Sequence, residues 1–501
     1  MTEIIEEVIM KKRTKIIATI GPASSSPAVI AKLIKAGMDA ARLNFSHGER
    51  KDHIRRIRLI RQASARAGKP IAIIQDLQGP KLRVGMMRND GVTLKRGDLV
   101  TITTKKVLGT ERTISITYPR LTKDLTSGDT VLFDDGKLEA RVVRRKGNDL
   151  QCKVIRGGVL KSHKGVNLPG ARLTLPSLSR KDKDDLLFGI QHGVDYIALS
   201  FVRTASDIET TRAFLRKAGA NIPIIAKIEK PEAIDNLEKI IHAADGIMVA
   251  RGDLGVEMSP ERVPLLQKLI IRACNDAEKP VITATQMLES MIENPQPTRA
   301  EASDVANAIL DGTDCVMLSG ETAVGKHPVQ AITVMARIAE QAETSLEPLP
   351  PDRHIGGMDE SVAHAACRAA AEQHARAIVT FTQTGSTALL VSKHRPAADI
   401  IAPTPFERVA RKVSLYWGVI PVILKAMKTT DAMIRGVETI MLEKDLAGKR
   451  DLIVITAGVP IGVAGSTNMM KLHRVGELKG LEAGRQRKET VRRYRIEKGL
   501  P

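Results

Sequence analysis

Two stretches decide the fold of this chain: Ile224-Ile-Ala-Lys-Ile-Glu229 and, a short distance on, Gly246-Ile-Met-Val-Ala-Arg-Gly-Asp253. Each is a short apolar run that ends in charged residues, and a segment of helical length and mixed polarity separates them. Lys227 and Glu229 are two residues apart, so a β-strand presents both side chains on the same face. This pattern predicts parallel strands joined by helices, with charged side chains gathered at the carboxyl ends of the strands.

Further runs of the same kind occur along the chain. The full set is Lys15–Gly21, Ala40–Gly48, Ile71–Gln78, Val194–Val202, Ile224–Glu229, Gly246–Asp253, Pro280–Gln286 and Cys315–Glu321. The polar residues toward their carboxyl ends are Arg42, Asn44, Ser46, Asp76, Ser200, Arg203, Lys227, Glu229, Asp253, Thr285, Ser319 and Glu321. Eight such β-α units predict a TIM (β/α)8 barrel enzyme, whose active site lies at the carboxyl ends of the strands. The alternative is a set of buried strands whose polar ends arise by chance. This alternative is disfavoured, because so many of the strand ends carry charge.

Length and composition are those of a soluble cytoplasmic protein without a membrane span. The chain has 501 residues, which predicts roughly three domains, and no apolar run approaches the ~18 residues of a transmembrane helix. The first residues, Met1–Arg13, carry three glutamates before a basic cluster and do not resemble a signal peptide. The four cysteines lie far apart without a CxxC pair, which suits a reducing compartment.

The formal net charge of +20 raises the question of a nucleic-acid partner. The basic residues are spread along the whole chain, and the few aromatic residues do not interleave with them as stacking platforms would. The one dense basic stretch, Gly484–Gly499, is interpreted as an exposed tail. A nucleic-acid partner is therefore not expected, and the positive charge suits an anionic substrate.

A change of pattern marks a β-domain inserted after the third strand. Turn signals such as Asp134-Asp135-Gly136 separate short alternating runs. The runs are Val100–Lys105, Thr113–Thr117, Thr130–Phe133, Lys137–Val143 and Leu150–Ile155.

A proline-rich linker, Glu347–Asp352, marks the second boundary. Beyond it, helical segments alternate with apolar runs, which predicts an α/β domain with a largely parallel sheet. The expected parts are a barrel (1–83 and 173–346), an inserted β-barrel (84–172), a C-terminal α/β domain (356–476) and a basic tail (477–501).

Lys227, Glu229 and Asp253 form the group with the most specific chemistry. Two carboxylates on neighbouring strands can hold Mg²⁺, which takes one or two protein carboxylates and keeps its other positions for water and substrate oxygens. A lysine beside that ion can stabilise a phosphoryl group in transfer. Each of these residues, taken alone, could instead belong to a surface ion pair at a strand end. That alternative explains the whole group poorly, because Arg42 and Thr285 are expected at the same end of the barrel.

A second polar group combines Arg42, Asn44 and Ser46, which alternate along one strand, with Asp76 on the next strand. Its oxygen atoms could bind a cation. Lys81 follows five residues after Asp76, and its ammonium group could occupy the same oxygen cage.

Two other motifs are interpreted as structural. Gly320-Glu-Thr-Ala-Val-Gly-Lys-His327 nearly matches a P-loop, but its last position is His, so the hydroxyl that would bind Mg²⁺ is missing. Thr298-Arg-Ala-Glu301 fits a helix capping box and predicts a helix over Glu301–Leu310.

From about Arg13 to Val475 the chain resembles the pyruvate kinase family. The resemblance rests on Thr14-Lys-Ile-Ile-Ala-Thr-Ile-Gly-Pro-Ala23, Arg42-Leu-Asn-Phe-Ser-His-Gly48, Lys227-Ile-Glu229, Met248-Val-Ala-Arg-Gly-Asp-Leu-Gly255, Thr283-Ala-Thr-Gln-Met-Leu-Glu-Ser-Met291, Pro297-Thr-Arg-Ala-Glu301 and Met317-Leu-Ser-Gly-Glu-Thr322. It implies a barrel with an inserted lid and a C-terminal regulatory domain. It also implies the reaction of phosphoenolpyruvate with ADP to give pyruvate and ATP.

The resemblance also assigns roles. The catalytic residues would be Lys227, Thr285, Arg42, Ser319 and Glu321, and the ligands of Mg²⁺ (or Mn²⁺) would be Glu229 and Asp253. The amides of Gly252 and Asp253 would receive the substrate carboxylate. Nucleotide contacts would come from Asn44, His47, Arg83 and Lys164. Whether Thr285 or a water chain with Ser319 and Glu321 delivers the proton to the product stays open.

The chain departs from the commonest family pattern at Leu77 and Lys81. Many members have Thr and Glu at these positions and require K⁺. A lysine in place of that glutamate resembles the K⁺-independent branch, so the equivalents of the monovalent-cation site are Asn44, Ser46, Asp76, Leu77 and Lys81.

The C-terminal domain contains a candidate effector loop made of Thr382, Thr384, Gly385, Ser386 and Thr387. A glycine and several hydroxyls before a helix can form a phosphate nest. An ordinary helix cap is the alternative. Family members bind phosphorylated effectors at this loop, which implies an allosteric homotetramer, and a second loop, Ala457–Thr467, could fold over the ligand.

Two other function classes remain. Another phosphoenolpyruvate or 2-oxo-acid barrel enzyme would need Mg²⁺ but no nucleotide lid. A nucleic-acid-binding protein with an inactive barrel would tolerate loss of the strand-end residues, yet all of them are present.

Overall fold

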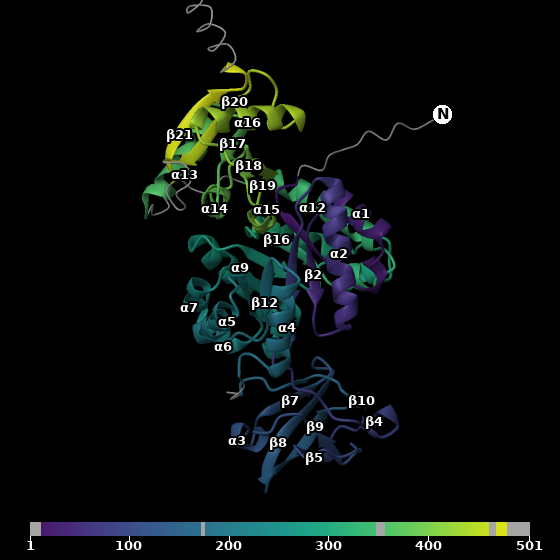
Figure 1. Ribbon diagram of the computed structural model, residues 1–501. Coiled ribbons are helices and arrows are strands. Elements are labelled where there is room, and N and C mark those ends of the chain that lie inside the picture. Colours follow the sequence, from purple (N-terminus) through teal and green to yellow (C-terminus); the bar gives the residue numbers. More distant parts are fainter. Residues whose placement is uncertain (1–11, 172–175, 347–355, 460–466, 478–501) are drawn as a thin grey trace, which may run out of the picture.

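The computed structural model describes residues 12–171, 176–346, 356–459 and 467–477. Three parts follow one another along one axis (Figure 1): the C-terminal domain, the barrel and the inserted domain. Three predicted segments lie outside the described residues. They are the proline-rich linker, most of the loop Ala457–Thr467, and the basic tail except for its first residue. Within the described part, no helix is both long and apolar enough to cross a membrane.

The predicted TIM barrel is confirmed. Eight parallel strands close in the order β1-β2-β3-β12-β13-β14-β15-β16. Their bounds are Lys15–Thr19, Met38–Asn44, Ala72–Asp76, Tyr196–Leu199, Ile224–Ile228, Gly246–Ala250, Val281–Ala284 and Cys315–Leu318. Side chains alternate between two cores: Ile17, Ile225 and Met248 pack inside the barrel, whereas Ile16 and Ile224 pack against the outer helices.

Several strands are shorter than the predicted runs, because the polar ends leave the sheet. Strand β14 ends at Ala250, and helix α8 (Arg251–Glu257) begins at once. Asp253 therefore lies in the first turn of a helix. The sequence had suggested instead that it lies at the end of the strand. Glu321 likewise lies in the short helix α11 (Gly320–Ala323), within the stretch that nearly matches a P-loop.

Helices cover the outside of the barrel. Their bounds are α1 Pro27–Lys35, α2 Arg50–Ala67, α4 Arg180–Gln191, α5 Ala205–Lys217, α6 Pro231–Asp235, α7 Leu237–Ala243, α9 Val263–Asp276, α10 Arg299–Leu310 and α12 Pro328–Glu343. Helices α1, α4 and α10 begin with a side-chain cap from Ser26, Ser179 and Thr298. The predicted capping box is present, because the Thr298 hydroxyl accepts a hydrogen bond from the Glu301 amide and the Glu301 carboxylate accepts one from the Thr298 amide.

The inserted domain has its own apolar core, which runs from Leu82 to Ala171. Its strands are β4 Gly91–Leu94, β5 Leu99–Thr103, β6 Thr113–Ser115, β7 Thr130–Phe133, β8 Leu138–Lys146, β9 Asp149–Arg156, β10 Gly158–Lys161 and β11 Val166–Asn167, with one short helix, α3 Leu121–Asp124. They form a six-stranded sheet, β11-β7-β8-β9-β5-β6, and a two-stranded sheet, β10-β4. In the described residues the inserted domain therefore has two separate sheets where a closed β-barrel was expected.

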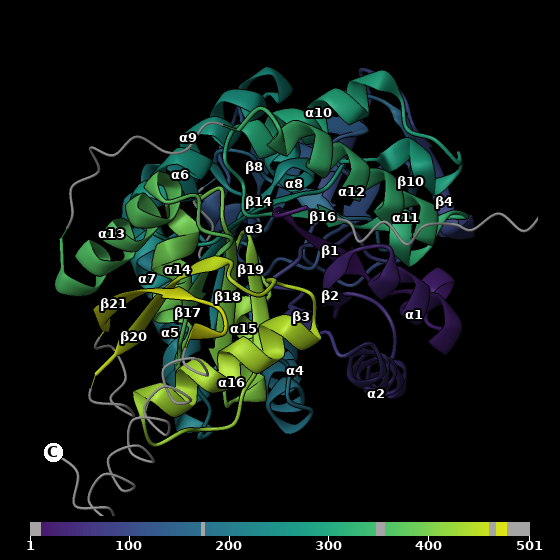
Figure 2. The same ribbon diagram turned by 90° about the horizontal axis from the view of Figure 1, so that it is seen from above.

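The C-terminal domain has a five-stranded sheet in the order β19-β18-β17-β20-β21. The strands are β17 Ala377–Thr380, β18 Asp399–Thr404, β19 Val419–Ile423, β20 Leu452–Gly458 and β21 Thr467–Arg474; the helices are α13 Met358–Glu372, α14 Ser386–Lys393, α15 Glu407–Val413 and α16 Thr430–Glu443. Four strands are parallel, as predicted, and β21 is an antiparallel edge that the sequence pattern did not indicate. Helices α13 and α16 cover opposite faces of this sheet (Figure 2).

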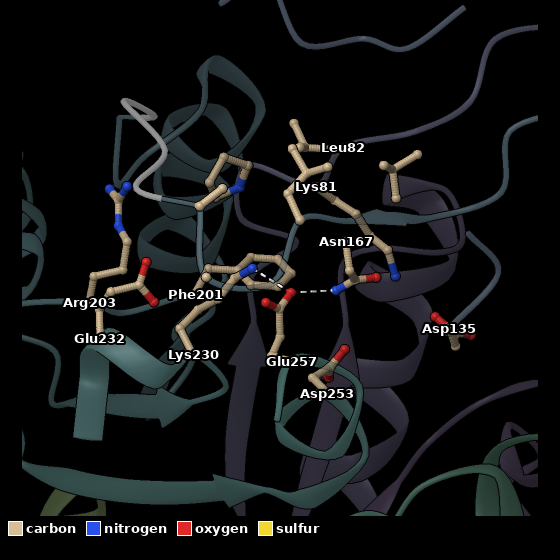
Figure 3. A pocket seen from close by; sticks show the side chains of 15 residues that line it. Lys81, Leu82, Asp135, Asn167, Phe201, Arg203, Lys230, Glu232, Asp253 and Glu257 are labelled. Atoms are coloured by element: carbon tan, nitrogen blue, oxygen red, sulfur yellow. Dashed lines mark hydrogen bonds and ion pairs between the residues drawn. The ribbon is translucent and has the colours of Figure 1, made fainter. Parts of the chain in front are cut away.

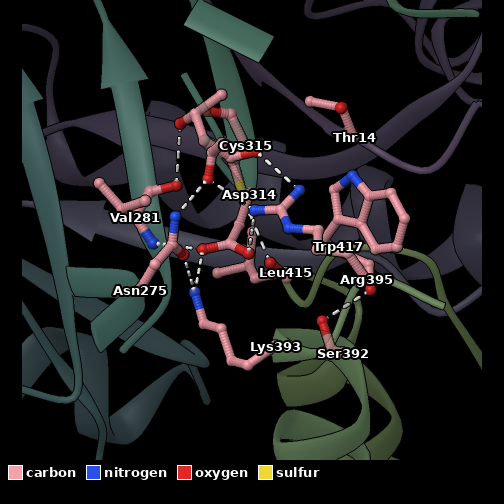
Figure 4. Close-up of polar contacts among 12 residues, drawn as sticks. Thr14, Asn275, Val281, Asp314, Cys315, Ser392, Lys393, Arg395, Leu415 and Trp417 are labelled. Carbon is pink, nitrogen blue, oxygen red and sulfur yellow. Dashed lines mark hydrogen bonds and ion pairs between the residues drawn. The ribbon is translucent and has the colours of Figure 1, made fainter. Parts of the chain in front are cut away.

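The C-terminal domain docks on the end of the barrel where the strands begin (Figure 4). Asp314, directly before β16, accepts from Lys393 at 2.6 Å and from Arg395 at 3.1 Å. Asp314 and Lys393 are each only 1% exposed, and the Arg395 guanidinium lies 4.7 Å from the ring of Trp417. We call Asp314, Lys393 and Arg395 the floor cluster. Because this domain covers the floor, the opposite end of the barrel is left to face the inserted domain.

Candidate active site

A buried lysine lies at the centre of the barrel mouth. Lys227, on β13, is 8% exposed, and its Nζ donates to Ser200 Oγ at 2.7 Å and to Asp76 Oδ1 at 3.2 Å. It also lies 2.8 Å from Glu229 Oε1. Burial alone would lower the pKa of Lys227, but the charges of Asp76, Glu229 and Asp253 outweigh it and raise the pKa above its usual value. The ammonium group is therefore a fixed positive charge.

Asp76 connects Lys227 to Arg42. Its Oδ2 lies 2.7 Å from Arg42 Nε, while its Oδ1 accepts from Lys227. Burial would raise the pKa of Asp76, but the two cations outweigh burial and lower it. Arg42 Nη1 also donates to Thr19 Oγ1 at 3.0 Å. Predicted residues from β2, β3 and β13 thus meet in one ion cluster, with Thr19 on β1 as a further anchor.

Glu229 and Asp253 form a carboxylate pair. Burial and the negative charge of Asp253 raise the pKa of Glu229, although Lys227 opposes this effect. Glu229 Oε2 accepts from the amide of Phe201 at 2.8 Å, and Phe201 has a φ of 56°, a conformation that is costly for a bulky residue. Two carboxylates of like charge at the same end of the barrel could bind a divalent cation. In the described part of the chain no group of three or more acidic, His or Cys side chains could hold a metal.

A strained turn presents Thr285. The φ angles of Thr285 and Gln286 are 67° and 54°. Thr285 Oγ1 accepts from the Gly252 amide at 2.8 Å and donates to the Ala284 carbonyl at 2.6 Å. A Cβ at Gly252 would lie 3.3 Å from that hydroxyl oxygen, so glycine permits the close approach of helix α8.

Arg251 holds this turn, and sequence reasoning gave it no role. Its Nη2 donates to the carbonyls of Thr285 at 2.7 Å and Gln286 at 3.1 Å, and its Nη1 lies 2.7 Å from Asp304. Arg251 is buried. The sequence does contain a signal for this role, because Arg251 directly follows the apolar run of β14. A buried arginine needs several hydrogen-bond acceptors nearby, so its position indicates a structural contact.

Ser319 and Glu321 meet at the end of β16. Glu321 accepts from the amides of Ser319 at 2.7 Å and Leu288 at 3.1 Å. Burial raises the pKa of Glu321, and these backbone hydrogen bonds oppose the rise. The Ser319 hydroxyl oxygen is buried and, in the part of the chain that the structure describes, has no hydrogen-bond partner. An orphaned buried hydroxyl is a natural contact for a water or a ligand.

The residues expected to bind nucleotide come from both domains. Arg83 and Lys164 lie where the inserted domain joins the barrel: Arg83 Nη1 donates to the His163 carbonyl at 3.0 Å, and Lys164 lies 2.9 Å from Asp134. Burial, followed by the charges of Arg83, Lys81 and Arg42, lowers the pKa of His47. The Asn44 side chain accepts from the Ser46 amide at 3.0 Å.

Lys81 and Leu77 lie on the segment that leads from β3 into the inserted domain. Leu77 is buried, and its carbonyl accepts from Ser200 Oγ at 2.8 Å. Lys81 packs against the inserted domain, because a Cβ at Gly165 would lie 3.4 Å from its Cε. Figure 3 shows Lys81 among the residues that line the cavity between the two domains.

In the effector loop, hydroxyls cap the start of helix α14. Thr382 Oγ1 accepts from the Gly385 amide at 2.8 Å, and Gly385 has a φ of 93°. The Thr387 hydroxyl lies 2.6 Å from that of Thr467, which ends the second predicted loop. Thr384 and Ser386 are exposed. The loop is thus shaped as a helix cap, with two hydroxyls left on its surface.

Comparison with known proteins adds to this geometry. The family model described as "Pyruvate kinase, barrel domain" matches residues 11–332, and the one described as "Pyruvate kinase, alpha/beta domain" matches residues 360–473. The chain belongs to the pyruvate kinase family. A pyruvate kinase of Staphylococcus saprophyticus is 49% identical over 488 residues, which is 95% of this chain and 83% of that protein. A pyruvate kinase of Geobacillus stearothermophilus is 48% identical over 495 residues, with the same coverage.

A solved pyruvate kinase structure has the same architecture. The crystal structure from Cryptosporidium parvum superposes with a TM-score of 0.87 at 39% identity, covering 93% of this chain and 96% of that one. Like its pyruvate kinase relatives, the chain is a phosphotransferase of glycolysis. Another phosphoenolpyruvate or 2-oxo-acid barrel enzyme is not favoured.

Proposed function

We propose that this pyruvate kinase family member uses the cluster around Lys227 to transfer the phosphoryl group of phosphoenolpyruvate to ADP, which yields ATP and pyruvate. The observation that carries this proposal is the buried ammonium of Lys227, which three carboxylates keep charged at the barrel mouth. A preorganised cation in a water-poor site stabilises a phosphoryl group between donor and acceptor oxygens.

Arg42 supports the same step from β2. Asp76 and Thr19 fix its guanidinium, so its remaining N–H groups can point at the phosphates of both substrates. The first turn of α8 would bind the substrate carboxylate through backbone amides. The Gly252 amide donates to Thr285 Oγ1, so a substrate carboxylate would exchange with that hydroxyl or bind chiefly at Asp253.

Glu229 and Asp253 would hold Mg²⁺, or Mn²⁺ in its place. Their like charges at the same end of the barrel support an ion that takes two carboxylates. When bound, the ion supplies positive charge that neutralises substrate and phosphoryl oxygens.

The proton that turns the enolate into pyruvate would come from the β15–β16 side of the mouth. Thr285 Oγ1 carries one candidate proton, and the orphaned Ser319 hydroxyl beside Glu321 can hold a water that carries another. Both routes remain part of the proposal.

The inserted domain would act as a lid over the nucleotide. Asn44, His47, Arg83 and Lys164 provide polar groups from both sides of the cleft, and closure would exclude water that could otherwise take the phosphoryl group. We further propose that K⁺ is not required. Lys81 supports this proposal, because it brings a permanent ammonium to the same end of the barrel as Asp76 and Ser46.

Regulation is proposed at the effector loop. The exposed hydroxyls of Thr384 and Ser386 at the start of α14 support binding of a phosphorylated effector to a homotetramer. Replacing both residues with Glu would repel a phosphate. Activation by sugar phosphates or nucleoside monophosphates should then disappear, while maximal velocity at saturating phosphoenolpyruvate stays. A double variant that still responds to an effector of the wild type would leave the loop a helix cap only.

A coupled assay tests the proposed reaction directly. Purified protein with phosphoenolpyruvate, ADP and Mg²⁺ should form ATP and pyruvate in equal amounts. Failure to form ATP under these conditions would overturn the proposal.

A cytoplasmic location is proposed as well, and the four unpaired cysteines support it.

A further inference from the structure

The hinge side of the lid contains a hydrogen-bonded group that none of the roles above uses. Glu257, the last residue of α8, is 6% exposed. Its Oε1 accepts from Asn167 Nδ2 of the lid strand β11 at 2.7 Å and lies 2.5 Å from Nζ of Lys230, which follows β13. Figure 3 shows Glu257 between Lys230 and Asn167, among the residues that line the cavity between lid and barrel.

Each member of this group is attached to an element of the proposed active site. Glu257 ends the helix whose first turn contains Gly252 and Asp253. Lys230 follows the Lys227–Glu229 strand, and its Nζ lies 5.8 Å from the ring of Phe201, whose amide donates to Glu229. Asn167 is two residues after Gly165. Gly165 pairs with Arg83 at the point where the chain enters and leaves the lid.

A carboxylate in this position is costly unless it stays paired. If the lid moves away as a body, the buried carboxylate of Glu257 loses its amide donor Asn167 and keeps only the Lys230 ammonium of the barrel. A charge-assisted hydrogen bond across two domains therefore favours one lid position over others. Because the bond ends on α8, that lid position is linked to the orientation of the substrate-binding turn.

We propose that Glu257 is a positioning residue that latches the lid to helix α8, so that lid position and the Gly252–Asp253 turn change together. This inference rests on the proposed function, since the lid carries the proposed nucleotide contacts. Nucleotide should bind more weakly when the latch is removed. Water should also reach the phosphoryl group more often, which gives pyruvate without ATP.

Three variants test the latch in the full-length enzyme. Glu257→Ala removes both contacts, Asn167→Ala removes the lid contact only, and Glu257→Gln keeps an oxygen that can accept from Asn167. Glu261→Ala, at an exposed acidic residue a few positions on, is the matched control. The measurements are KM for ADP, KM for phosphoenolpyruvate, kcat, the ratio of pyruvate to ATP formed, and the thermal unfolding midpoint.

We expect Asn167→Ala and Glu257→Ala each to raise KM for ADP about tenfold, with a smaller change for phosphoenolpyruvate and a pyruvate-to-ATP ratio above one. A double variant that combines Asn167→Ala with Glu257→Ala should be no worse than Glu257→Ala alone, because both changes break the same contact. Glu257→Gln should recover part of the loss. The latch is overturned if Asn167→Ala leaves both KM for ADP and the ratio as in Glu261→Ala, or if the only change in the variants is a lower unfolding midpoint. A wild type that forms no ATP would instead overturn the proposed function.

Discussion

The two ends of the barrel each bury a cluster of opposite charges, and the clusters differ in what is left over. In the floor cluster, Asp314 Oδ2 accepts from Lys393 and from the Val281 amide, while Oδ1 accepts from Arg395. At the mouth, three carboxylates, Asp76, Glu229 and Asp253, act on Lys227, and Asp76 also binds Arg42. Carboxylate charge in excess of the two cations can bind a further cation at the mouth, whereas Asp314 on the floor is shared by Lys393 and Arg395.

The first way to test this contrast is to break the floor cluster. Asp314→Asn removes the buried carboxylate that Lys393 and Arg395 share, which should cost ~3–5 kcal/mol of unfolding free energy. Chemical denaturation of the wild type and the variant measures this loss. Turnover at a temperature where the variant is folded should stay within about twofold of wild type, since the reacting groups lie at the other end. A large loss of turnover in fully folded Asp314→Asn would show that the two ends are not separable.

The reciprocal change is made at the mouth. Lys227→Met should lower turnover at least ~10²-fold, because one preorganised cation at the phosphoryl group is lost. Binding of phosphoenolpyruvate, measured by calorimetry, should be largely kept. Lys393→Met is the matched control: another buried lysine, whose loss should lower stability but not turnover. Near-normal turnover in Lys227→Met would remove it from the chemistry.

The carboxylate pair at the mouth should control the metal requirement. Glu229→Gln and Asp253→Asn should each raise the Mg²⁺ concentration for half-maximal activity at least about tenfold, because two carboxylates supply all the protein's charge to the ion. Titrating activity against Mg²⁺ gives this value. If half-saturation is unchanged in both variants, the ion binds elsewhere.

The smallest expected effect concerns monovalent cations. Wild-type activity should be the same in K⁺ and tetramethylammonium buffers, because Lys81 supplies the charge. The double change Leu77→Thr with Lys81→Glu should lower the rate several-fold without K⁺ and recover part of it with K⁺, since a hydroxyl and a carboxylate are ligands for that ion. A wild type that needs K⁺ for most of its rate contradicts this interpretation.

The sequence predicted the mouth far better than the floor. Lys227 and Glu229 end an apolar run, and the period of a strand placed their side chains together. Asp76 was predicted in a separate group with Arg42, and the structure joins it to Lys227. Asp253 was assigned to a strand end although it lies in helix α8, because an apolar run does not reveal where its backbone changes conformation. Lys393 lies on a helix of another domain, and only domain docking brings it to Asp314.

Other omissions have the same cause. Ser200 was recognised as polar, but its role as acceptor for Lys227 depends on how neighbouring strands align. Arg251 could not be assigned to the Thr285 turn, since its acceptors are carbonyl oxygens, which every residue has. Strand β21 is an exposed edge with no continuous apolar run, so its pairing depends on the template that β20 offers.

The insertion of the lid has a consequence for how the chain folds. Arg83 pairs with Gly165, so the lid starts and ends at nearly one point and can complete its own core early. The barrel must instead join β3 to β12 across the whole lid, with Ile74 beside Tyr196, and β1 to β16 across the whole barrel sequence, with Lys15 beside Cys315. Pairings between such distant segments form slowly. We therefore expect the lid to fold first and the closure of the barrel to limit the rate at which the enzyme becomes active.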